Sequence, residues 1–219
     1  IGGGIYCVGA ATATNCTVSN NSATFEGGVA LVGSGTFNIR NTVIAGNTAT
    51  SVSPDANGNF TSQGHNLIGD PAGANGFTAT GDQTGINPQL LPLTSNGGKT
   101  RTHALQAGSP AINAGGDTYA PAYDQRYLLR NGTSDIGAYE YNGLTPSLKI
   151  TSLAHLATGE FFLQGLGIAN APHTVQVSAN LTSGFSYLAT VTSDATGTVQ
   201  FDDQGAIGAT KRFYRLTFP

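Results

Sequence analysis

Short alternations of apolar and polar residues recur at a regular spacing in the first third of the chain. The segment NCTVSNNSA from Asn15 matches NTVIAGNTA from Asn41, and NLIG from Asn66 continues the series at nearly the same interval. A second series aligns GGIYCV from Gly3 with GGVALV from Gly27. Self-similarity at a period of roughly 20 to 30 residues is typical of solenoid proteins.

Each repeat has the pattern of short strands joined by tight corners. β-branched residues alternate with Thr, Ser or Asn, as in strands buried on one side, and Gly and Asn separate these runs. Gly and Asn both tolerate the positive φ that sharp corners need. Three strands and three corners fill about 25 residues, which is one turn of a parallel β-helix. A leucine-rich repeat would share the period, but the chain lacks Leu at the required positions. We therefore predict stacked turns over residues 1–70 and one hydrogen-bonded ladder of three side chains, Asn15, Asn41 and Asn66.

The periodicity fades from Pro71 onward. Residues 71–143 have turn-forming residues every few positions and little alternation. An irregular run of this length is usually functional or a cap. A solenoid needs a cap because its last turn otherwise leaves unpaired strand edges and an open apolar core. The sequence therefore predicts a loop-rich cap over residues 71–143.

The last third of the chain changes character after the linker residues Gly143 and Pro146. Six short alternating segments follow, separated by turn signals such as SDATG and TSG: LKITSLAHL, EFFLQGL, HTVQVSAN, FSYLATVTS, GTVQFDD and RFYRLTF. This spacing predicts an antiparallel β-sandwich of immunoglobulin or fibronectin-III type over residues 144–219. The segment contains no cysteine, so an immunoglobulin disulfide is excluded.

Several separated motifs resemble the choice-of-anchor Q domain of bacterial surface proteins. They are NTVIAGNTA, PDANGNFTSQGHNLIGD, TGDQTGINPQLLPLTSNGGKTRTHALQAGSPAINAG and DQRYLLRNGTSDIGAYEY, and together they cover roughly residues 41–141. The resemblance implies a bacterial protein at the cell surface and the end of a right-handed parallel β-helix. It implies no catalytic residues. VTSDATGTVQFDD and KRFYRLTFP are similar to small sandwich modules of exported bacterial proteins.

The motifs DQR and DIGAYEY hold several of the few charged residues of the chain. An arginine can form two hydrogen bonds to one carboxylate, so we predict salt bridges that hold the cap together. Two alternatives stay open, a Ca²⁺ site and a pair of carboxylates that act as acid and base on a sugar. The residues concerned are Asp124, Arg126, Asp135 and Glu140.

Composition narrows the function classes. Only 10% of the residues are charged, the net charge is −3 and no basic cluster occurs, which argues against nucleic-acid binding. No apolar run approaches the roughly 20 residues that span a bilayer. Abundant Gly, Thr, Ser and Asn suit an extracellular, all-β protein. The chain opens at Ile1 within an expected strand, so we expect either a removed leader or upstream turns.

The cysteines and histidines give no metal-ligand spacing. Cys7 and Cys16 fall in one turn, where they form either a disulfide or two separate buried thiols. His103 belongs to the family-like motif THAL and is expected to make a hydrogen bond in the cap. We therefore predict no catalytic residue, no cofactor and no metal site.

These observations predict a non-enzymatic structural or adhesive element of a bacterial surface. The strands of the first turn would lack a neighbour on one side, so they need upstream turns, a local cap or another molecule. A head-to-tail contact between copies would produce a filament. Two alternatives remain, a β-helix polysaccharide lyase or hydrolase and a glycan-binding module. In the second, exposed aromatic rings would stack on sugars, with Tyr119, Tyr123 and Tyr127 as candidates.

Overall fold

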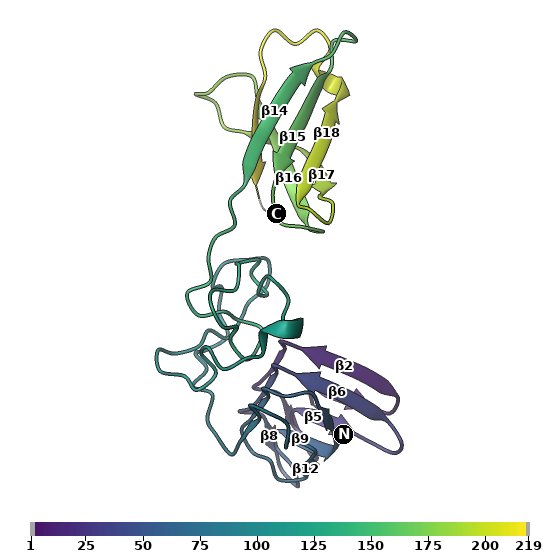
Figure 1. The fold of residues 1–219 in the computed structure, drawn as a ribbon, viewed down its shortest axis with the longest axis vertical. Coiled ribbons are helices and arrows are strands. Elements are labelled where there is room, and N and C mark those ends of the chain that lie inside the picture. Colours follow the sequence, from purple (N-terminus) through teal and green to yellow (C-terminus); the bar gives the residue numbers. More distant parts are fainter. Residues whose placement is uncertain (1–2, 218–219) are drawn as a thin grey trace. The chain divides into compact units, whose positions relative to one another are not determined.

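A computed structural model describes residues 3–217 of the chain, which is all-β apart from two short 3-10 helices in that range. The chain divides into two compact units, Ile1–Leu144 and Thr145–Pro219 (Figure 1). The division falls one residue after the boundary expected from the linker. Each unit has its own core, so each is described by itself.

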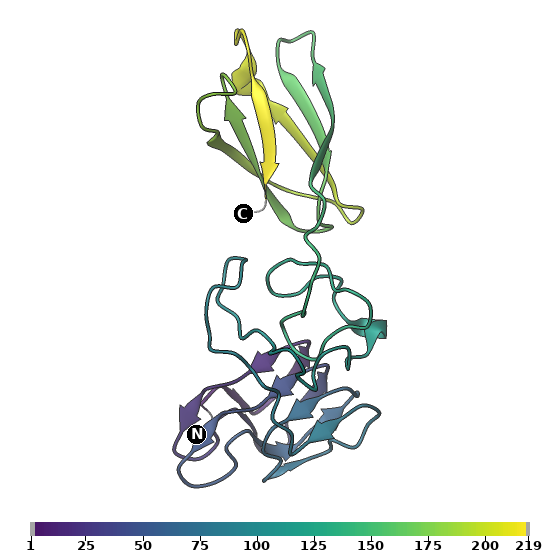
Figure 2. The ribbon, with the colours of Figure 1, turned by 90° about the vertical axis from the view of Figure 1, so that its left-hand side faces the viewer.

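The first unit is built from short strands that recur with each pass of the chain. They are β1 (Ile5–Cys7), β2 (Ala10–Thr14), β3 (Thr17–Val18), β4 (Ser22–Ala23), β5 (Val29–Leu31), β6 (Thr36–Arg40), β7 (Val43–Ile44), β8 (Thr48–Ala49), β9 (Ala56–Asn59), β10 (Thr61–Ser62), β11 (Leu67–Ile68), β12 (Ala74–Asn75) and β13 (Gln83–Thr84). Successive passes add strands to four parallel sheets, in the orders β1-β5-β9-β12, β2-β6-β10, β3-β7-β11-β13 and β4-β8. The first two passes contribute to all four sheets, and the later passes contribute to fewer. Figure 2 shows the strands of successive passes lying beside one another.

One apolar core joins the sheets. Leu31 of β5, Ile39 of β6 and Ile44 of β7 are buried in the same cluster, which explains the alternation in the sequence, because every second side chain points inward. Three phenylalanine rings continue this core along the passes. Phe37 and Phe60 have centroids 5.6 Å apart, and Phe60 and Phe77 have centroids 5.1 Å apart. Such tilted ring pairs add to the stabilisation from burial alone.

The two ends of the stack differ. At the last pass, Phe77 packs on Phe60, and the Asp82 carboxylate accepts hydrogen bonds from Asn66 N (2.9 Å) and Ser62 Oγ (2.7 Å). The Phe77 ring covers the apolar core at this end, and the Asp82 carboxylate satisfies polar groups at part of the strand edge. At the first pass, β1, β2, β3 and β4 each lie at the edge of their sheet. The prediction that the repeats end at Asp70 was wrong, since β12 and β13 extend two of the sheets to Thr84.

The irregular segment has two roles, whereas the sequence predicted a single cap on the end of the coil. Residues 74–84 close the last pass, as described above. The later residues lie against the outer side of the sheet that contains β7 and β11. There, side chains of the sheet form a second buried cluster with side chains of the irregular segment: Val43, Ala45, Leu67, Leu105, Ala111 and Ile136.

The second unit consists of two antiparallel sheets of three strands each. The strands are β14 (Lys149–His155), β15 (Phe161–Leu166), β16 (Pro172–Ser178), β17 (Ser186–Thr192), β18 (Thr198–Asp203) and β19 (Phe213–Thr217). The sheet orders are β14-β15-β18 and β17-β16-β19. All six expected segments form strands. Val175, Val199 and Leu216 form the buried core of this unit.

Candidate functional site

The polar residues of the first unit gather at the corners between the strands of the parallel sheets and in the irregular segment that follows them. One corner turns through residues of positive φ, namely Asn15 (48°), Asn41 (46°) and His65 (56°). Asn is among the few L-residues that occupy this region readily, which explains why asparagines punctuate the repeats.

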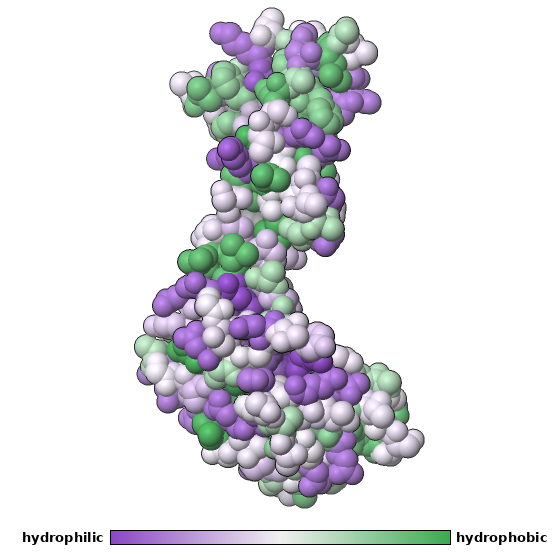
Figure 3. Space-filling view, viewed as in Figure 1, coloured by the Kyte–Doolittle hydropathy of each residue, from purple (hydrophilic) through white to green (hydrophobic). Residues whose placement is uncertain are grey.

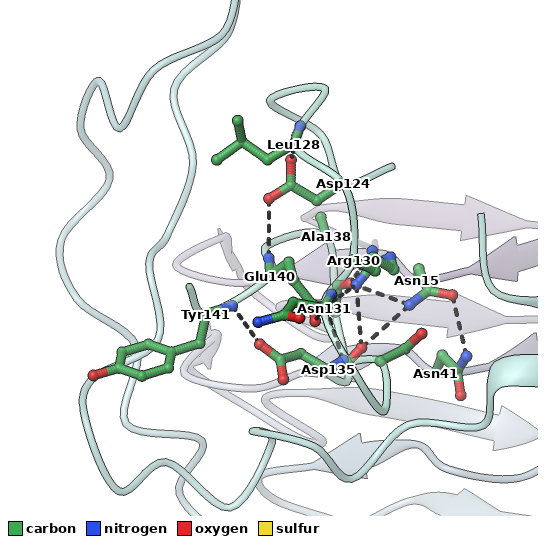
Figure 4. A network of polar contacts seen from close by, with 12 residues as sticks. Asn15, Asn41, Asp124, Leu128, Arg130, Asn131, Asp135, Ala138, Glu140 and Tyr141 are labelled. Carbon is green, nitrogen blue, oxygen red and sulfur yellow. Dashed lines mark hydrogen bonds and ion pairs between the residues drawn. The ribbon is translucent and has the colours of Figure 1, made fainter. Parts of the chain in front are cut away.

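Asn15 and Asn41 form the predicted ladder and also hold the irregular segment. Asn41 Nδ2 donates to Asn15 Oδ1 at 3.1 Å. Asn15 Nδ2 donates to the carbonyl of Asp135 at 3.2 Å (Figure 4). Asn41 makes two hydrogen bonds to the backbone of Gly116, as acceptor at 2.8 Å and as donor at 2.7 Å. The ladder therefore fixes segments about 75 and 120 residues away in the chain.

Asn66 does not continue this ladder, which corrects the prediction. Leu67 pairs with Val43, so His65 lies opposite Asn41 and Asn66 lies one position further on. Asn66 Oδ1 accepts the backbone N–H of Thr42 at 3.1 Å. His65 instead bonds the irregular segment through its ring, because its Nδ1 lies 2.8 Å from the Ala114 carbonyl oxygen.

A second corner contains a ladder that ends in a buried aspartate. Asn21 N donates to Asn47 Oδ1 at 3.0 Å, and Asn47 N donates to Asp55 Oδ1 at 2.8 Å. Asp55 Oδ2 accepts the backbone N–H of Asp70 at 2.7 Å. The repeat of Asn21 and Asn47 is visible in the sequence. Asp55 has no counterpart in the repeat, so sequence reasoning missed it.

Asp124 is the centre of the buried ion network in the irregular segment. Its carboxylate pairs with Arg126 through Nε at 2.8 Å and Nη2 at 2.6 Å, as predicted. The same carboxylate accepts the backbone N–H groups of Arg126, Leu128 and Glu140. The Arg126 guanidinium also lies 3.6 Å from the ring centroid of Tyr139. This one carboxylate therefore organises a loop that lacks regular strands (Figure 4).

Glu140 is paired at 2.8 Å with Arg130, a residue outside the predicted set. Arg126 contacts only the main chain of Glu140, since its Nη2 donates to the Glu140 carbonyl oxygen. The Glu140 carboxylate also accepts the backbone N–H groups of Asn131 and Asp135. Arg130 lies ten positions before Glu140 in the chain, and no motif spacing points to the pair.

Among the described residues no salt bridge forms at Asp135, where the sequence predicted one, and its carboxylate accepts backbone hydrogen bonds instead. Asn113 N donates to it at 2.7 Å, and Tyr141 N donates at 2.5 Å. Burial raises the pKa of the Asp135 carboxyl to about 6, and the neighbouring Glu140 carboxylate acts in the same direction. The two backbone donors and the Arg130 guanidinium oppose this rise in pKa without cancelling it.

The two cysteines are free, so of the two arrangements expected for them the structure has the separate thiols. Each thiol donates to a backbone carbonyl two positions away in the chain, Cys7 to Gly9 and Cys16 to Thr14. Burial raises the pKa of the Cys16 thiol, which lowers its nucleophilicity near neutral pH.

The buried carboxylates are occupied by structural hydrogen bonds. Both oxygens of Asp55, Asp124 and Asp135 accept N–H groups of the protein. His103 contacts the Leu91 carbonyl oxygen through Nδ1 at 2.8 Å and Asn20 through Nε2 at 3.3 Å. Within residues 3–217, no three or more His, Cys, Asp or Glu side chains are grouped as a metal site would require. The helices of that same range are too short and polar to cross a membrane.

No model of a known protein family matches the chain, and no curated protein matches it either.

Proposed function

We propose that the chain is a non-catalytic structural element of a bacterial surface protein, built from the end of a right-handed parallel β-helix and a β-sandwich. The observation that carries this proposal is the use of the polar side chains. The corner asparagines and the buried carboxylates hold backbone N–H groups and arginines in place. A general base or a metal ligand needs an oxygen that is free to meet a substrate or an ion.

The arrangement of strands supports the β-helix. Successive passes add strands in parallel register to the same sheets, and the winding of the chain itself supplies the connection that parallel strands need. The two three-stranded antiparallel sheets of the second unit, with a common core, support the sandwich. The motifs that resemble the choice-of-anchor Q domain support the bacterial surface location.

On the face of the first unit seen in Figure 3, hydrophilic and neutral residues predominate, and hydrophobic residues are scattered among them. A surface of this kind suits a protein in contact with water.

Surface labelling and substrate assays test the two parts of this proposal. We expect antibodies against the chain to label intact cells of the producing bacterium, and we expect no product when the protein is incubated with polyuronates and calcium. Labelling that requires lysis would contradict the location. Release of unsaturated oligosaccharides would contradict the non-catalytic role and favour a lyase.

The proposal includes a contact at the first pass of the coil. Strands β1 to β4 are edge strands among the described residues, where either upstream turns of the same chain or another chain can pair with them. Phe77 and Asp82 cover the core and part of the strand edge at the last pass, so we propose that a second copy pairs through an edge strand of its sandwich. Such a head-to-tail contact forms filaments, which negative-stain images of the purified protein would show. Images of monomers alone would refute the filament.

A further inference from the structure

A groove of about 190 Å³ lies where the coil meets the irregular segment. One wall comes from the end of β6 and the corner before β11, and the other comes from the short helix η1 (Asp117–Tyr119) and the residue before it. The lining residues are Arg40, Asn41, Gln63, His65, Gly116, Thr118 and Tyr119. The volume is smaller than that of a drug-sized site, which suits one small residue of a larger ligand.

Arg40 gives this groove a positive charge that no carboxylate in its lining compensates. Its Nε donates to Gln63 Oε1 at 2.8 Å, and its guanidinium lies 4.0 Å from the ring centroid of Tyr119. Both neighbours are neutral. Three other arginines of the described residues pair with carboxylates: Arg126, Arg130 and Arg212. Arg40 is therefore held in position while its charge stays available to an anion.

Tyr119 and His65 add the features of a sugar site. Tyr119 is 69% exposed although the Arg40 guanidinium lies over its ring, so it offers an apolar surface beside the charge. The His65 Nδ1 lies 2.8 Å from the Ala114 carbonyl oxygen, which can only accept, so Nδ1 donates this hydrogen bond. The Thr118 hydroxyl adds a further hydrogen-bonding group to the lining.

We propose that this groove binds a carboxylate-bearing sugar residue of an acidic polysaccharide. Arg40 pairs with the carboxylate, Tyr119 packs against the ring of the sugar, and the polar lining residues hydrogen-bond its hydroxyl groups. The inference goes beyond the proposed structural role and does not depend on it, because binding needs neither a cell surface nor a filament.

The second unit contains a matched arrangement without a groove. Arg215 Nε donates to Gln176 Oε1 at 2.9 Å, and the Arg215 guanidinium lies 4.8 Å from the ring centroid of Phe185. None of these three residues lines any of the main cavities of the described chain. Comparing the two sites therefore tests whether binding needs the groove or only an arginine beside a glutamine and an aromatic ring.

Calorimetric titration of the full chain with a galacturonic acid trisaccharide and with its neutral galactose counterpart tests the proposal. We expect the acidic sugar alone to bind. Arg40→Ala and Tyr119→Ala should each weaken binding at least tenfold, whereas Arg215→Ala and the exposed Tyr187→Ala should leave it unchanged. Circular dichroism checks that each variant is folded.

Three outcomes would overturn the proposal. The first is equal binding of both trisaccharides, and the second is equal affinity of Arg40→Ala and Arg215→Ala. The third is displacement of the acidic sugar by acetate or sulfate at matching concentrations, because this would reveal a simple anion site with no role for the sugar ring. Failure of any kind here leaves the labelling and filament experiments unaffected.

Discussion

At the scale of single residues, the buried ion network concentrates charge in a chain that has little of it. The Arg126 side chain is only 6% exposed, and the Asp124 carboxylate that it contacts is fully buried. Because the Arg126→Ala variant leaves that carboxylate without its cation, we expect the free energy of unfolding to fall by about 3 kcal/mol. Urea denaturation monitored by circular dichroism measures the change.

Arg101→Ala is the matched control for this substitution. Arg101 lies in the same irregular segment, but it is exposed and makes no salt bridge among the described residues. We expect its replacement to change the free energy of unfolding by less than about 0.5 kcal/mol. Equal effects of the two substitutions would show that the network does not stabilise the fold.

Asp135 makes stability depend on pH in an unusual direction for a carboxylate. Its pKa of about 6 in the folded state exceeds the ordinary value of 3.8, so the folded protein binds this proton more tightly than the unfolded chain does. Its contribution to stability is therefore complete below about pH 4 and is lost as the pH rises through 6. The shift corresponds to about 3 kcal/mol.

The Asp135→Asn variant isolates this contribution, because it lacks the titrating group. We expect the stability of the wild type relative to the variant to fall by about 2 kcal/mol between pH 4 and pH 7, because the unfolded carboxyl is already partly ionised at pH 4. Parallel urea denaturation of both proteins at each pH measures this difference. A difference that stays constant with pH would mean that Asp135 titrates normally.

At the scale of strands and corners, close stacking of the passes explains several glycines. A Cβ on Gly28 would lie 2.2 Å from the Asp55 carbonyl oxygen of the next pass, although the φ of Gly28 is not positive. We expect Gly28→Ala to lower the free energy of unfolding by about 2 to 3 kcal/mol through this clash alone. Gly9→Ala is the control, since a Cβ there meets nothing within 4 Å. A similar loss in both variants would exclude the clash as the cause.

The sequence repeats predicted the strand register only where the spacing between matching segments equals the spacing between paired strand residues. The match of GGIYCV with GGVALV predicts the observed pairing of Ile5 with Val29. The match of Asn41 with Asn66 is wrong by one position. Thr17 pairs with Val43, and Val43 pairs with Leu67, so the second of these two spacings along the chain is the shorter one. Composition does not predict a small change in the length of a corner. A shift of one position nevertheless moves a side chain to the opposite face of its strand.

The irregular segment was the least predictable element, for a physical reason. Its order comes from contacts between residues that are distant in sequence, such as Asn15 with Asp135, and from the pair of Arg130 with Glu140. Neither contact produces a periodic pattern. The strands of the second unit were predictable because burial of one face makes every second residue of a strand apolar.

At the scale of the whole molecule, the separate cores predict that the two units unfold independently. The residues of the first-unit clusters and those of the second-unit cluster belong to different parts of the chain, with no residue in common. Units of this kind show separate transitions in calorimetry. We expect a fragment of residues 145–219 to fold alone and to unfold at the temperature of one of the two transitions of the full chain.

One substitution in each unit assigns the transitions. Arg126 pairs with Asp124 in the first unit, and Arg212 pairs with Asp203 at 2.6 Å in the second. Because each pair contributes to one unit only, Arg126→Ala should lower the midpoint of one transition and Arg212→Ala that of the other. A single transition that moves with either substitution would show that the units fold as one cooperative body. The isolated fragment would then lose its structure, since the larger part of that body would be missing.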